Sequence, residues 1–145
     1  MYPINFSKYS TRGQSFAELG VFLMVLMILL AGLLDLGRAF FTYIALRDAA
    51  QEGALYGSTN PTALSSIESR VRATSNTPVD LANTTDIQVR VTVIGPPCLG
   101  NSIQVDVEYA TFPLAMPFLG TILGRQTIPI RATVTDTILR PTCDP

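Results

Sequence analysis

The chain has 145 residues, of which 48% are hydrophobic and 14% are charged, and its mean hydropathy is +0.34. This length allows one small domain beside a membrane segment, and the composition is typical of a membrane-anchored protein. Because the chain has no histidine, a Ser-His-Asp triad, a Cys-His dyad and a histidine-containing zinc site are excluded within it, and a net charge of −1 without a basic patch argues against nucleic-acid binding.

The first element after the amino terminus is an apolar run of about 16 residues, Leu19–Leu34, which lies between the carboxylates of Glu18 and Asp35. A membrane-spanning helix needs roughly 20 residues, and Phe16 and Ala17 extend the run towards that length. The sequence therefore predicts a transmembrane helix that begins close to one carboxylate and ends close to another.

Lys8 and Arg12 precede this run, and no acidic residue accompanies them. The positive-inside rule then places the amino terminus in the cytoplasm and the chain beyond the run outside it. A cleaved secretory signal has similar hallmarks, but this run is longer than a typical signal core and no small-x-small cleavage site follows it. We predict a single-pass membrane protein with residues 59–145 as an extracytoplasmic domain.

The helical pattern continues past the apolar run, with no proline before Pro61. We predict one helix over residues 14–58, transmembrane in its lower half and amphipathic in its upper half, about 65 Å long. Small residues recur every fourth position in the upper half, and such a stripe lets another backbone approach closely. That backbone belongs either to the same chain or to a neighbouring subunit. The stripe consists of Ala45, Ala49, Gly53 and Gly57.

Beyond this helix the sequence predicts a short helix and then three strands. Asn60 is placed to cap the short helix, with Pro61 at its first position. Apolar and polar residues alternate in DIQVRVTVI, NSIQVDVEYA and TIPIRATVTDTI, as in half-buried strands. Pro129 makes the third strand an edge strand or one with an irregular start. The predicted fold is α+β, with a long helix packed on a small three-stranded antiparallel sheet.

An oily segment, FPLAMPFLGTILG at residues 112–124, separates the second and third strands. It is too short to span a bilayer. We interpret it as a loop that caps the core, and the alternative is an exposed apolar patch for a partner subunit.

One pair of carboxylates, Asp106 and Glu108 on the second strand, has the residue types of a glycosidase pair. Without a sign of a cleft, we expect a solvated sheet face there instead. We predict that the protein is not an enzyme and that it holds no cofactor or metal.

Both cysteines, Cys98 and Cys143, lie on the predicted exported side, where disulfides form. Cys98 lies in the turn after the first strand, and Cys143 lies on a tail with no other predicted anchor. We therefore predict a disulfide between them, with free thiols or an intersubunit bond as alternatives. This bond requires the end of the third strand to lie near the start of the second, so it favours the strand order one-two-three.

Residues 12–60 contain GQSFAELGVFLMVLMILL and DLGRAFFTYIALRDAAQEGALYG. This part closely resembles the TadE-like proteins, pilin-like components of tight-adherence pili in the type IV filament superfamily, and the remainder resembles them more loosely. The resemblance implies a pilin-like fold and a leader, residues 1–13, that prepilin peptidase cuts after Gly13. Gln14 would then be the first mature residue and Glu18 the fifth.

The resemblance also implies roles for charged residues. Glu18 would meet the amino terminus of a neighbouring subunit, since a buried carboxylate is costly without a cation. Alternatively, it lies at the membrane interface, where the helix dipole stabilises it. Asp35 and Arg38 match the family's Asp-x-Gly-Arg pattern, and we expect a same-helix ion pair, with an intersubunit contact as the alternative.

Two functions remain from these arguments. The first is a pilin-like structural subunit that assembles through its amino-terminal helix with copies of itself or other pilin-like subunits, in contact with membrane lipid, into an extracellular filament. The second is an uncleaved single-pass accessory subunit of another membrane complex. The candidate assembly residues are Glu18, Asp35, Arg38, Ala45, Ala49, Gly53 and Gly57.

Overall fold

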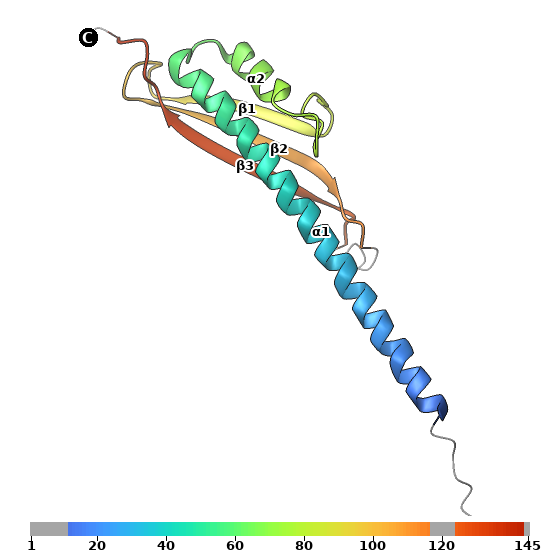
Figure 1. Cartoon of the computed structure of the whole chain (residues 1–145). Coiled ribbons are helices and arrows are strands. Elements are labelled where there is room, and N and C mark those ends of the chain that lie inside the picture. The colour runs from blue at the N-terminus through green and yellow to red at the C-terminus, as the bar shows by residue number, and fades with distance from the viewer. Residues whose placement is uncertain (1–11, 117–123, 144–145) are drawn as a thin grey trace, which may run out of the picture.

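The computed structural model describes residues 12–116 and 124–143 (Figure 1). Residues 1–11 of the predicted leader and 117–123 of the oily segment lie outside this description. The elements are two helices followed by three strands. They are α1 (Arg12–Thr59), α2 (Leu64–Ala73), β1 (Ile87–Ile94), β2 (Ser102–Pro113) and β3 (Thr127–Thr137).

Helix α1 is one uninterrupted helix of 48 residues. It contains the whole predicted range of 14–58 and extends slightly beyond it at both ends. Figure 1 shows that its upper part crosses one face of the sheet while its lower part projects beyond the sheet. The long apolar helix on a small antiparallel sheet confirms the α+β prediction, and the continuity of α1 follows from the absence of proline along it.

The three strands form an antiparallel meander in the order β1-β2-β3, as predicted. In the register, Val89 faces Val107 and Val105 faces Val134, so the apolar residues of neighbouring strands gather on one face of the sheet. Pro129 lies in β3, an edge strand, where its missing N–H group costs no hydrogen bond to a further strand.

The core lies between this apolar face, the upper half of α1 and α2. A Cβ atom on Gly53 would overlap Cγ2 of Val71, and one on Gly57 would lie 2.6 Å from Cδ1 of Ile103. The small residues therefore let α1 approach its own domain, and these contacts favour the intramolecular interpretation of the stripe. The fully buried side chains include Leu46, Ala49, Ala50, Ile67, Val71, Ile103, Val105 and Val107.

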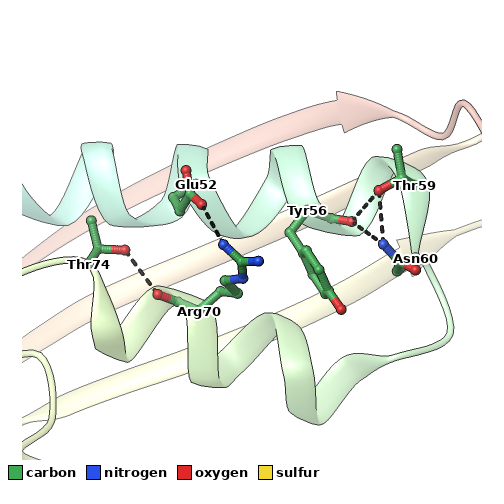
Figure 2. Close-up of polar contacts among 6 residues, drawn as sticks. All are labelled: Glu52, Tyr56, Thr59, Asn60, Arg70 and Thr74. Carbon is green, nitrogen blue, oxygen red and sulfur yellow. Dashed lines mark hydrogen bonds and ion pairs between the residues drawn. The ribbon is translucent and has the colours of Figure 1, made fainter.

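Helix α2 does not begin as predicted. It begins at Leu64 with Ala63 at its N-cap position, and no side chain caps it. The Asn60 amide instead donates to the Tyr56 carbonyl oxygen at the end of α1, at 3.4 Å (Figure 2). The predicted Asn60 cap is therefore wrong, because the orphan carbonyls at the end of α1 compete for the same side chain.

Ionic and aromatic contacts join the exposed sides of α2 and α1 (Figure 2). Nη1 of Arg70 lies 3.4 Å from Oε1 of Glu52, and the Arg70 guanidinium lies 5.0 Å from the centre of the Tyr56 ring. Exposed ion pairs contribute little to stability, so the buried Ile67 and Val71 carry most of this packing.

The carboxyl-terminal tail is fixed by more than a disulfide. Cys98 and Cys143 are joined, as predicted, with their Cα atoms 5.4 Å apart. The Leu139 N–H group also donates to the Ser58 carbonyl oxygen at 2.7 Å, and the Leu99 N–H group donates to the Pro141 carbonyl oxygen at 2.8 Å. The expectation that the tail has no other anchor is therefore wrong.

Replacing both cysteines by alanine is expected to lower the free energy of unfolding by less than about 4 kcal/mol. The chain-entropy model gives that upper value for a loop of 45 residues. The actual loss is smaller because the tail keeps its backbone hydrogen bonds to Ser58 and Leu99. Urea unfolding of the full chain in detergent checks this, and a loss above the upper value would mean that the hydrogen bonds depend on the disulfide.

Candidate membrane anchor and assembly site

The lower half of α1 exposes apolar side chains on all sides. Phe16 is 78% exposed and Leu29 is 65% exposed. Among the described residues, one helix is long and apolar enough to cross a membrane, and its most apolar window has a mean hydropathy of 2.6 with 6% of it buried. A core helix of a soluble domain would bury such a surface, so this half of α1 has the character of a membrane anchor.

Among the side chains that the structure describes, no charged group contacts Glu18 on this exposed helix. Nε2 of Gln14, one turn earlier, donates to Oε1 of Glu18 at 3.5 Å, the long end of the hydrogen-bond range. Because α1 begins at Arg12, Glu18 lies beyond the first turn, where the helix dipole acts most strongly. In a chain cut after Gly13, however, Glu18 would be the fifth residue, so the dipole alternative and the pairing of Glu18 with another subunit both stay predictions.

Asp35 is only 4% exposed, although it lies at the end of the apolar run. Its carboxylate pairs with Nη1 of Arg38 at 3.4 Å, which is the expected same-helix ion pair. It also accepts hydrogen bonds from the backbone N–H groups of Ala115 and Met116, at 3.1 and 2.8 Å. Sequence reasoning missed this contact across 80 residues, and the only signal for it was an acidic residue directly after an apolar run.

Arg38 links the same region to the sheet. Its guanidinium lies 5.4 Å from the centre of the Phe112 ring, a cation–π contact. Beside it, a groove of about 650 Å³ separates α1 from the end of β2 and the segment that follows α2. Among the residues that line this groove, Asp48 is the single carboxylate, so the groove does not bring two acidic groups together for catalysis.

Asp106 contradicts the expectation of a solvated sheet face, because it is 5% exposed. Its carboxylate lies 2.9 Å from Nη2 of Arg131 and accepts hydrogen bonds from the Thr133 hydroxyl group and the Gln104 amide. Burial acts to raise the pKa of Asp106, but these hydrogen bonds and the charge of Arg131 outweigh burial and lower the pKa below its ordinary value. The cluster is a satisfied polar network on the outer face of the sheet.

Acid is expected to destabilise the domain partly through Asp106. Since its pKa is lower in the folded state, its contribution is complete above the unfolded value near 4 and is lost as the pH falls through the folded value. The Asp106→Asn variant should therefore lose less stability than the wild type between pH 7 and pH 3. Urea unfolding at several pH values checks this, with the exposed Asp48→Asn variant as control. Equal slopes for Asp106→Asn and wild type would contradict it.

The predicted site residues do not form one constellation. Glu18 and Asp35 are separated by about 25 Å along α1, at a rise of 1.5 Å per residue. Gly53 and Gly57 lie higher still and face the protein's own core. The apolar side chains of the anchor and the Glu18 side chain are exposed and could contact a partner. The Asp35 carboxylate already binds N–H groups of the chain's own β2–β3 loop.

Comparison with known proteins places the resemblance on the same helix. Residues 13–55 match the family model described as TadE-like protein. The matched range begins at Gly13 and includes Glu18, Asp35 and Arg38, and it confirms the resemblance drawn from these residues. No curated protein and no solved structure matches the chain significantly.

Proposed function

We propose, from the TadE-like character of residues 13–55, that the protein is a pilin-like structural subunit of a tight-adherence filament of the type IV superfamily. The observation that carries this proposal is the exposed apolar lower half of α1, which continues without a break into a helix that is packed in a folded domain. The family match also supports a structural role for the chain rather than an enzymatic one.

This geometry suits a subunit that moves from a bilayer into a helical bundle. The lower half of α1 finds an apolar environment in either place, so the transfer exposes little apolar surface to water. The upper half is held by the core, and the domain therefore moves together with its anchor. Such a subunit would enter the filament as one rigid body.

Glu18 gives the bundle its specificity in this proposal. A carboxylate inside an apolar bundle is costly unless a cation pairs with it. A cut after Gly13 would supply that cation as the new amino group of Gln14. Within one chain, Nε2 of the Gln14 side chain already lies 3.5 Å from Oε1 of Glu18. The amino group of a neighbouring subunit must therefore displace this hydrogen bond or bind Glu18 beside it.

Mechanical shearing of the cells that make this protein tests the proposal. A filament subunit is expected in the sheared surface fraction as well as in the membrane fraction, and a protein of the cytoplasmic membrane without filament function serves as the control for lysis. Complete retention in the membrane fraction would contradict the proposal. It would favour the alternative, an uncleaved single-pass accessory subunit of another membrane complex.

A further inference from the structure

The start of the loop between β2 and β3 contacts α1 at the end of its apolar run. The N–H groups of Ala115 and Met116 bind the Asp35 carboxylate. Cε of Met116 would lie 3.2 Å from a Cβ atom placed on Gly32. Figure 1 shows this end of β2 beside α1, where the helix leaves the sheet. Ala115 and Met116 are therefore fixed at the level of residues 32–35 of α1.

This level lies at the outer boundary of the bilayer if α1 spans a membrane. A hydrocarbon layer of about 30 Å takes roughly 20 helical residues. Counted from Leu19, directly after Glu18, that length ends at Arg38. Asp35 then lies about 4.5 Å and Gly32 about 9 Å inside the boundary, at a rise of 1.5 Å per residue, and Ala115 and Met116, which contact them, lie at that depth as well.

The chemistry at this level fits a lipid environment. An unpaired carboxylate at such a depth would be costly, yet the Asp35 carboxylate has two N–H donors and the Arg38 guanidinium. Leu114, Ala115 and Met116, at the start of the loop, carry no charge. Large apolar side chains of α1 are exposed at the same level, namely Leu33, Leu34 and Leu36.

Two arginines border this apolar level. The Arg38 side chain is half exposed, and Arg125 is exposed just before Gln126, whose carbonyl oxygen accepts a hydrogen bond from the Leu114 N–H group at 3.0 Å. Long basic side chains at such a position extend towards phosphate headgroups. Apolar residues with basic residues at their border are the arrangement expected for contact with a lipid surface.

We propose that Leu114 and Ala115, at the start of the β2–β3 loop, form a second contact with the lipid bilayer, and that Asp35 is the positioning residue that holds them there. The inference rests on the proposed membrane anchor, but it does not require filament assembly. Lipid is the expected partner because Ala115 is exposed and Leu114 is half-buried, and both lie beside the exposed apolar surface of the anchor. A domain held at two points would have a fixed orientation on the membrane.

Spin labelling of the full chain in phospholipid vesicles tests this proposal. The native cysteines form a disulfide, so an Ala115→Cys variant carries a single free thiol for a nitroxide label. We expect this label to collide mainly with oxygen, which concentrates in lipid, as a label on a Leu36→Cys variant should. A label on Thr92→Cys, exposed on β1, should collide mainly with a water-soluble nickel chelate. An Ala115→Cys label as accessible to nickel as the Thr92→Cys label would overturn the proposal.

A second variant tests the role of Asp35. Adding Asp35→Ala to Ala115→Cys removes the acceptor of both N–H groups, so the label should become more mobile and more accessible to nickel. Asp35→Asn, which keeps one amide oxygen, should give an intermediate result. An unchanged spectrum in the Asp35→Ala background would overturn the positioning role.

A label deep in the anchor separates this inference from the proposed anchor itself. A Leu29→Cys label should be inaccessible to nickel. If it is accessible, α1 does not span the bilayer, and the second contact is rejected together with the anchor. If only the Ala115→Cys label is in water, the loop contact is rejected while the anchor and the filament subunit stand.

Discussion

Replacing Glu18 by alanine is expected to reduce the amount of this protein in the sheared surface fraction by more than roughly tenfold, with the membrane fraction unchanged. Removing one partner of a buried ion pair costs about 3–5 kcal/mol, because the other charge stays buried without compensation. In the proposed bundle that other charge is the amino group of Gln14. The domain itself should be unaffected, because Glu18 lies on the exposed lower half of α1, far from the core.

Two companion variants sharpen this test. Glu18→Gln keeps the shape of the side chain and removes its charge, so it should fail nearly as badly as alanine. Glu52→Ala removes a glutamate from the upper half of the same helix, where its partner Arg70 is exposed, and it should assemble normally. Equal filament yield from Glu18→Ala and the wild type would contradict the pairing role.

Replacing Gly53 by leucine is expected to destabilise the domain at the upper end of the roughly 1–3 kcal/mol range of overpacking. Even the first atom of the new side chain would overlap Cγ2 of Val71, and it would lie 3.4 Å from Cγ1 of Val105. Both neighbours are fully buried, so α1, α2 and the sheet must separate to admit it. For a domain of this size, each kcal/mol lowers the melting temperature by about 4–8 °C.

The same helix offers a matched control for this experiment. A Cβ atom on Gly37 would meet nothing within 4 Å, so Gly37→Leu should leave the melting temperature unchanged or raise it through better helix propensity. The comparison uses thermal unfolding of the full chain in detergent. If Gly53→Leu melts like Gly37→Leu, the small-residue stripe does not pack against the chain's own domain.

Local patterns sufficed for most of the fold. The helix over residues 14–58 follows from apolar spacing without proline, and the three strands follow from strict alternation of apolar and polar residues. The prediction of a disulfide between Cys98 and Cys143 rested on the exported side that both residues share, and the bond in turn favoured the observed strand order. The helix and strand predictions depend only on residues that are neighbours in the sequence. The strand order depends on one constraint, that Cys98 and Cys143 lie close enough to bond.

The errors arose where a polar side chain has a partner that the sequence pattern did not indicate. Asn60 looked like an N-cap, but the Tyr56 carbonyl oxygen lies within its reach. Asp106 looked solvated because the alternation of the strand pointed it outward, yet Arg131 and Thr133 of the neighbouring strand cover it. Alternation shows which face a residue occupies, and it does not show what the adjacent strand places over that residue.

The sequence predicted only part of the candidate site. It indicated the apolar anchor and Glu18, because an unbroken apolar run and a carboxylate at its start can be recognised without knowing the fold. The contact of Asp35 with Ala115 and Met116 is invisible there, because it joins residues about 80 positions apart through backbone N–H groups that every residue except proline carries.

The mass of the mature protein tests the central proposal most directly. Intact-mass measurement of the protein purified from the sheared surface fraction of native cells should show the loss of Met1–Gly13, so that Gln14 is the first residue. That amino group is the cation that the proposed bundle requires for Glu18. A protein that keeps residues 1–13 would lack this cation beside Glu18 and would contradict assembly through that pair.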